Sequence, residues 1–158
     1  MSAAQRAMRD VLQLLLSNFD EAYEKKAWHG PNLRGALRGV RADDAVRRTR
    51  EGSHTIWELT AHAAYWKTVA RRRLLRLRGA TGAANWIVSP DAVDERAWRE
   101  LVRTLDREHR ALREAIAFMT DADLRDAKKL RLITGVTAHD VYHAGQIQLV
   151  KRLLLVDR

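Results

Sequence analysis

Four long segments of the chain carry apolar residues at the three- and four-residue spacing of an α-helix. They cover about residues 2–28, 55–78, 89–119 and 134–156. The chain has two prolines, Pro31 and Pro90, and both lie outside the interiors of these segments. No segment alternates apolar and polar residues as a half-buried strand does. We therefore expect an all-α fold in which four amphipathic helices form a four-helix bundle.

Capping signatures indicate where the first three helices begin. The matching residues are Ser2 with Gln5, Thr55 with Glu58, and Ser89-Pro90-Asp91. The second helix is expected to end near Gly79, a residue type favoured just after a helix. The connection from residue 28 to residue 54 is too long for a simple turn. We expect short helical turns near residues 32–37 and 42–47 within it.

Length and composition limit the class of protein. A chain of 158 residues is typical of one domain, here residues 1–158. There is no cysteine, which excludes disulfides, thiolate nucleophiles and cysteine-ligated metal. No apolar run approaches the roughly 18–20 residues that span a bilayer, and the first residues do not resemble a signal peptide. We expect a cytoplasmic protein with no membrane partner.

The formal net charge is +9, and the densest basic tract is residues 71–78. This tract fits either a phosphate-binding patch or the cationic end of a helix, where cations complement the negative end of the dipole. We favour the helix end, because no aromatic residues alternate with the arginines to stack on bases. No specific nucleic-acid partner is expected, and nucleic-acid binding is the weakest of three functional hypotheses.

The positions of the histidines indicate a metal site. Six occur, at positions 29, 54, 62, 109, 139 and 143. His139 and His143 are four residues apart, so they share the helix face that also carries Val136 and Ile147. His62 lies in the apolar stripe of the second helix. If the helices alternate in direction, the second and fourth run the same way and the three imidazoles lie at similar depth.

Three inward-facing imidazoles are a ligand set for a divalent metal that leaves one position open to water or substrate. Zinc or nickel is expected first, with iron or manganese as alternatives, because imidazole suits several metals. Asp140 and Gln146 flank the pair and are candidates to orient the ligands. His29 and Glu58 are weaker candidates for catalysis, since Glu58 already has a capping role. His54 and His109 are expected to be structural.

Three stretches carry a family resemblance: Trp28-His29-Gly30-Pro31, residues 53–66 with His54 and His62, and residues 134–147 with the run Tyr142-His143-Ala144-Gly145-Gln146. Together they resemble the DinB/YfiT-like family, damage-inducible metalloproteins with a four-helix bundle. The resemblance spans nearly the whole chain and is weakest from about residue 80 to 130. It implies that His62, His139 and His143 are the metal ligands. It also implies a homodimer and a role in stress or detoxification.

Relatives in that family include transferases that use a low-molecular-weight thiol and proteins described as metal-dependent hydrolases. The first hypothesis is therefore a metal-dependent enzyme of either kind, acting on a small-molecule substrate. The N-terminal ends of the second and fourth helices are expected to face the site and favour an anionic ligand. The alternative is a non-enzymatic, metal-stabilised protein that acts through binding.

Overall fold

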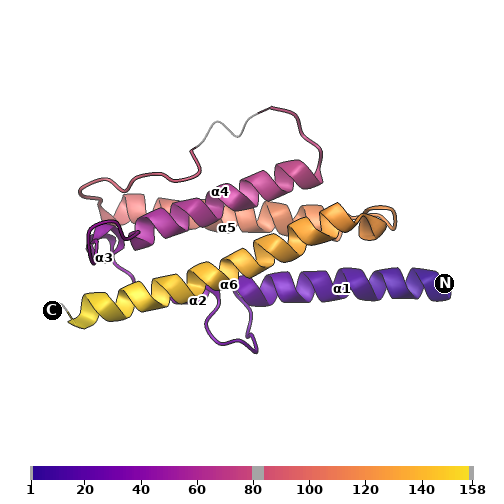
Figure 1. Cartoon of the computed structure of the whole chain (residues 1–158), viewed down its shortest axis with the longest axis horizontal. Coiled ribbons are helices and arrows are strands. Elements are labelled where there is room, and N and C mark those ends of the chain that lie inside the picture. Colours follow the sequence, from indigo (N-terminus) through magenta and orange to yellow (C-terminus); the bar gives the residue numbers. More distant parts are fainter. Residues whose placement is uncertain (1, 80–83, 157–158) are drawn as a thin grey trace.

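The structure, a computed structural model, describes residues 2–79 and 84–156. The described residues form six α-helices, one 3-10 helix and no strand, so the all-α prediction is confirmed. Four helices are long: α1 (Ala3–Tyr23), α4 (Ile56–Leu74), α5 (Glu95–Ala117) and α6 (Ala127–Val156) (Figure 1). The short helices α2 (Leu33–Ala36) and α3 (Ala42–Val46) lie in the connection between α1 and α4, where helical turns were predicted. The 3-10 helix η1 (Asp123–Arg125) precedes α6.

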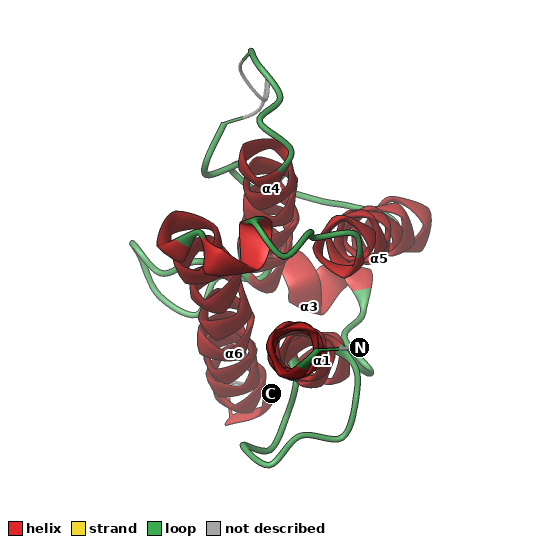
Figure 2. Cartoon of the chain, turned by 90° about the vertical axis from the view of Figure 1, so that its right-hand side faces the viewer, coloured by secondary structure: helices red, strands yellow, loops and turns green. Residues whose placement is uncertain are grey.

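The long helices surround a common core in the order α1, α5, α4, α6, so that α1 lies diagonally from α4 and α5 from α6 (Figure 2). Residues 84–94 run back along α4, and α5 therefore runs parallel to α4 (Figure 1). Helix α6 is antiparallel to α4. The prediction that the second and fourth helices run in the same direction is wrong, because it assumed that consecutive helices alternate in direction, whereas α4 and α5 are parallel.

Several helix boundaries also differ from the predictions. Helix α1 ends at Tyr23 rather than near residue 28. Helix α5 starts after Asp94, whose side chain accepts from the Ala97 N–H at 2.7 Å, so Ser89-Pro90-Asp91 is not its cap. Helix α6 begins at Ala127 rather than near residue 134, because the Asp126 carboxylate accepts the Lys128 N–H at 2.9 Å.

Both predicted capping boxes are confirmed, at Ser2 with Gln5 and at Thr55 with Glu58. In each box the side chain of either residue accepts the backbone N–H of the other. These bonds satisfy donors that have no partner inside the helix. These boxes define the starts of α1 and α4.

Buried apolar side chains form two clusters along the molecule. One contains Ile56 of α4 and Ile147 of α6, and the other contains Phe19 of α1 and Ile116 of α5. The charged side chains of Lys67 and Asp140 are also fully buried. None of the described helices combines the length and the apolar character needed to cross a membrane.

Candidate metal centre

His62, His139 and His143 come together where the second turn of α4 crosses the middle of α6. The Nε2 atom of His139 lies 3.2 Å from Nε2 of His62 and 2.9 Å from Nε2 of His143. One potential ligand atom from each ring lies within 4.8 Å of the others. Ligand nitrogens on a tetrahedral zinc ion, at 2.0–2.1 Å from the metal, are about 3.3 Å apart. The spacing of the three imidazoles therefore suits one metal ion.

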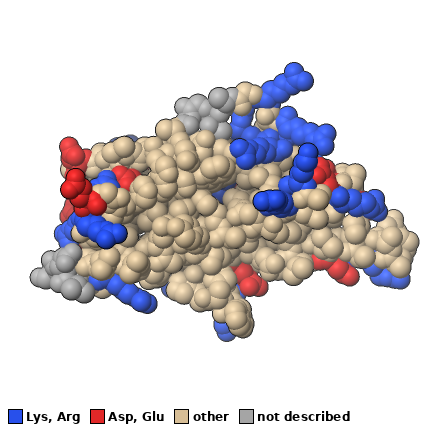
Figure 3. Space-filling view, in the orientation of Figure 1, with Lys and Arg blue, Asp and Glu red and all other residues tan. Residues whose placement is uncertain are grey.

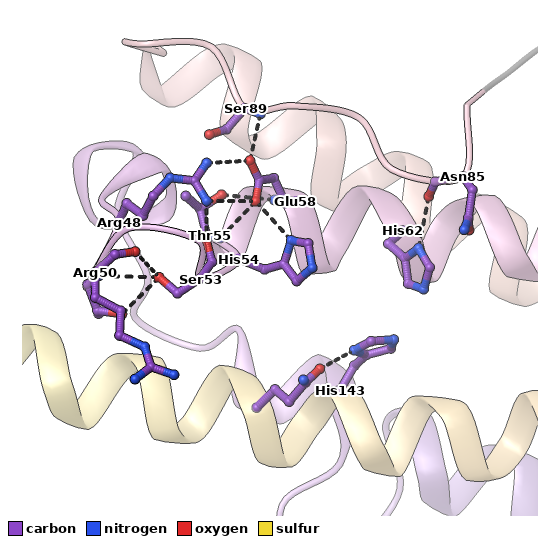
Figure 4. A network of polar contacts seen from close by, with 12 residues as sticks. Arg48, Arg50, Ser53, His54, Thr55, Glu58, His62, Asn85, Ser89 and His143 are labelled. Atoms are coloured by element: carbon purple, nitrogen blue, oxygen red, sulfur yellow. Dashed lines mark hydrogen bonds and ion pairs between the residues drawn. The ribbon is translucent and has the colours of Figure 1, made fainter.

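Hydrogen bonds outside the cluster orient two of the rings (Figure 4). His62 Nδ1 lies 2.8 Å from the Asn85 carbonyl oxygen, and His143 Nδ1 lies 2.6 Å from Oε1 of Gln146. Both acceptors require the proton on Nδ1, which leaves the Nε2 lone pair facing the cluster. With its proton on Nε2, His139 can donate to only one of its two neighbours. With its proton on Nδ1, the lone pair of its Nε2 faces the lone pairs of the other two rings, an arrangement that a cation would relieve.

Burial lowers the pKa of all three imidazoles. The pKa of His139 falls to about 3, because burial is reinforced by His143, His62 and Lys67. The pKa of His143 falls to about 4, mainly through burial. All three rings are consequently neutral at pH 7, which is the form that binds a metal.

Trp86 forms a wall of the site. Its indole is stacked between the rings of His54, at 3.7 Å between centroids, and His62, at 3.8 Å. Trp86 and Asn85 belong to segment 75–94, and sequence reasoning missed both. Helical spacing could not find them because they lie in a loop. The only signal was a tryptophan in a run rich in glycine and alanine.

A cavity of about 910 Å³ opens on the three imidazoles. Trp66, Trp86 and Tyr142 line it beside them, and basic residues line it farther away. Because all three histidines face this one cavity, a metal held by them would keep a coordination position accessible to a small molecule.

Glu58 is held by several donors and does not line this cavity. Its carboxylate accepts from Arg48 at 2.6 Å and from the backbone N–H groups of Ser89 and Thr55 at 3.2 and 3.1 Å (Figure 4). His54 Nδ1 lies 3.2 Å away. Burial by itself would raise the pKa of Glu58, but these hydrogen bonds lower it to about 2. Its contacts are those of an anchoring carboxylate that stays ionised.

The other candidate residues lie in different surroundings. Gln146 contacts His143 directly, whereas the described partner of the Asp140 carboxylate is Lys67 Nζ at 2.5 Å. His29 is exposed and lines grooves beside Pro31 and α6, away from the cavity of the triad. His109 is buried between the rings of Phe19 and Tyr23.

The antiparallel course of α4 and α6 also changes the electrostatics expected at the site. Only α4 begins near the triad, since the N-terminal end of α6 lies at the far end of the cavity, where Lys128 lines it. The prediction that two helix N-termini face the metal position is therefore wrong.

A family model described as the DinB superfamily matches residues 27–147, a region that includes all three histidines of the cluster. Neither a curated protein nor a solved structure gives a significant match to the chain.

Proposed function

The chain belongs to the DinB superfamily, and on this premise we propose that it is a single-domain divalent-metal-binding protein with the ligands His62, His139 and His143. The observation that carries the proposal is the convergence of three neutral imidazoles whose Nε2 atoms face one another within a cavity. Zinc or nickel suits this donor set, with iron or manganese as alternatives. In this proposal the four long helices form the four-helix bundle of the family.

We propose further that the protein is a metal-dependent enzyme acting on a small molecule, either a hydrolase or a transferase that uses a low-molecular-weight thiol. A divalent metal in this site would supply Lewis acidity toward a water molecule, carbonyl or thiol at the open position. Asn85 and Gln146 orient two of the ligand rings. Trp66 and Trp86 line the cavity beside these rings with apolar surface, which limits the access of water to a bound molecule.

A non-enzymatic role is the second candidate, and one observation favours it. Among the described residues that line the cavity, Asp126 is the only carboxylate, and it caps α6. The cavity therefore offers no described carboxylate free to act as a general base. In this role the metal would join α4 to α6, and the protein would act through binding.

A homodimer is also proposed from the family resemblance. Exposed apolar side chains on α6, including Leu149 at 58% and Leu155 at 66% exposure, support it because such surface is commonly covered by a partner. Sedimentation equilibrium of the wild-type chain and of Leu149→Lys tests this arrangement. A monomeric wild-type chain would contradict it.

Metal analysis of untagged protein tests the ligand set. We expect about one divalent ion per chain in the wild type and loss of that ion in His62→Ala, His139→Ala and His143→Ala. His29→Ala is the matched control and should keep its metal, because His29 lies outside the cavity. A wild-type chain that takes up no metal after incubation with zinc, nickel, manganese or iron would contradict the proposal.

Cobalt substitution then separates the two roles. A cobalt spectrum that changes when a small thiol or azide is added shows a replaceable ligand and supports the enzymatic role. An unresponsive spectrum with a complete ligand shell would favour the non-enzymatic role.

A further inference from the structure

The cavity that contains the triad ends in a group of basic side chains. Arg73 lies in the last turn of α4 and Arg76 just after that helix, and Lys128 and Arg131 lie in the first turns of α6. These two helix ends are neighbours because α4 and α6 are antiparallel. Lysine and arginine side chains gather over this part of the surface (Figure 3). We call these four residues the basic end of the cavity.

The basic end carries four cations beside one described carboxylate, Asp126, which accepts the Lys128 backbone N–H at 2.9 Å. None of the four side chains makes an ion pair with a residue that the structure describes. The nearby Lys129 differs, since its ammonium lies 2.5 Å from the Asp123 carboxylate. Arg73 lies over the Trp66 ring, with 5.7 Å between the guanidinium carbon and the ring centroid. Unpaired cations beside an aromatic wall suit a ligand that is both anionic and apolar.

The backbone at Arg76 is a second indication that its side chain matters. Arg76 has φ of 54°, the only positive φ at a non-glycine position among the described residues. It closes α4, with the Leu77 N–H bonded to the Arg72 carbonyl at 2.9 Å. Glycine is preferred at this left-handed position because other residues are strained there. The fold by itself would favour glycine, whereas the arginine side chain lines the cavity.

The rise per residue of α4 and α6 gives the distance between the three histidines and the basic end of the cavity. Arg73 lies about 16 Å along α4 from His62, and Arg131 lies about 12 Å along α6 from His139, at 1.5 Å per residue. Apolar side chains line the cavity between these points, including Ala70 and Val136. The apolar stretch is thus bounded by imidazoles at one end and by cations at the other.

We infer that the cavity takes an elongated amphipathic anion, with an apolar body along α4 and α6 and an anionic group at the basic end. The inference rests on the proposed function for the opposite end of the ligand, because it places the reacting group of the substrate at the three histidines. The substrate class is therefore a small molecule whose reactive group and anionic group are separated by about 12–16 Å of apolar structure.

Binding of matched probes to the full chain tests the inference. The probes are ω-mercaptoundecanoate and ω-mercaptoundecanol, which differ only in charge, and the short pair mercaptopropionate and mercaptopropanol. Tryptophan fluorescence reports binding because Trp66 and Trp86 line the cavity. Zinc-loaded and metal-free protein are compared, and the chain has no cysteine that could form a disulfide with a probe.

We expect the Kd of the zinc-loaded wild type for the long acid to be at least about fivefold lower than for the long alcohol. Each partly exposed cation of the basic end contributes a modest attraction to the carboxylate, and several together give a difference of this size. The short pair should show no such preference, because it cannot reach the basic end. In Arg76→Gly and in Arg131→Gln the preference should fall at least about twofold. Arg76→Gly should keep its zinc and unfold at the same or a higher temperature.

Arg99→Gln is the control, because the substitution removes the same charge from an exposed position on α5 that does not line the cavity. No preference for the long acid in the wild type would overturn the inference. An equal loss in all three variants would also overturn it, since net charge alone would then explain the effect. A preference that depends on Arg76 in a chain that binds no zinc would support the basic end and contradict the proposed metal site.

Discussion

Lys67 and Asp140 form an ion pair with no exposed side-chain surface, 2.5 Å apart. The Lys67 ammonium also lies 4.9 Å from the centre of the Phe19 ring and 4.8 Å from that of Tyr23. Moving two charges out of water costs several kcal/mol per ion, and their attraction offsets that cost only while both partners are present. The pair joins α4 to α6 next to His139, one of the three histidines of the cluster.

We expect Lys67→Met to lower the free energy of unfolding by about 3–5 kcal/mol, because it leaves the Asp140 carboxylate buried without a counterion. The double variant Lys67→Met/Asp140→Leu should recover most of that loss, and urea unfolding measures both. Arg107→Met is the control, since its exposed pair with Glu100 should be worth less than about 1 kcal/mol. A double variant no more stable than the single one would contradict this prediction.

His109 is a second buried group whose charge state affects stability. Burial and the charge of Lys67 lower the pKa of its imidazole to about 2. The unfolded chain, with a pKa near 6.5 for this group, therefore binds a proton in mild acid that the folded chain does not bind. The resulting loss of stability is absent above the unfolded pKa and grows as the pH falls below it.

The variant His109→Phe removes this titration and can still stack between Phe19 and Tyr23. Below about pH 6, its free energy of unfolding should gain on that of the wild type by about 1.4 kcal/mol per pH unit. Urea unfolding from about pH 7.5 to about pH 5 in the presence of a chelator measures the difference. Parallel curves for the two proteins would show that His109 does not titrate in this way.

At the scale of elements, Glu58 connects the start of α4 with two other segments of the chain. Arg48 precedes α4, and Ser89 belongs to the segment that also carries Asn85 and Trp86. We expect Glu58→Gln to lower the free energy of unfolding by about 1–3 kcal/mol, because charge-assisted hydrogen bonds in a buried setting are lost.

Thermal unfolding checks the Glu58 prediction, with Glu51→Gln as a control at an exposed position nearby. If Glu58 instead acted as a general base, its replacement would reduce activity while leaving stability close to that of the control.

The starts of α1 and α4 could be predicted because capping boxes are local signals within a few residues. The starts of α5 and α6 could not be predicted in this way. Other residues near Asp94 and Asp126 are equally acceptable N-caps, so the local sequence does not single out these two. The direction of α5 depends on segment 75–94, which has no helical spacing. Here the sequence predicted an ordinary helix end, and no pattern in it indicated that residues 84–94 run back along α4.

The meeting of His62 with His139 and His143 was predicted, but from a fourth helix that started too late and ran in the same direction as α4. In the structure the pair lies near the middle of α6 and crosses an antiparallel α4 at its second turn. The apolar stripes placed all three rings toward the core, and this part of the reasoning was independent of direction.

At the scale of the whole molecule, a metal held by His62, His139 and His143 would join α4 to α6. We expect a metal that binds only the folded chain to raise its stability, by about 2.7 kcal/mol when the free metal is about 100 times its Kd. Calorimetry with zinc and with a chelator measures the change. His139→Ala should unfold at the same temperature under both conditions, whereas His29→Ala should respond as the wild type does. A wild type that does not respond would contradict the metal site.

The diagonal placement of α1 and α4, and of α5 and α6, has a consequence for how the chain reaches this structure (Figure 2). Along the described chain, no two consecutive long helices form an antiparallel hairpin, and the consecutive neighbours α4 and α5 are parallel. Among consecutive long helices of the described chain only α4 and α5 pack together, across a connection of about twenty residues, whereas α1 packs against α5 and α6, so loop-closure entropy is lost before most of the core contacts form. The chain should fold more slowly than an up-and-down bundle of equal length, in one cooperative step that needs its C-terminal helix.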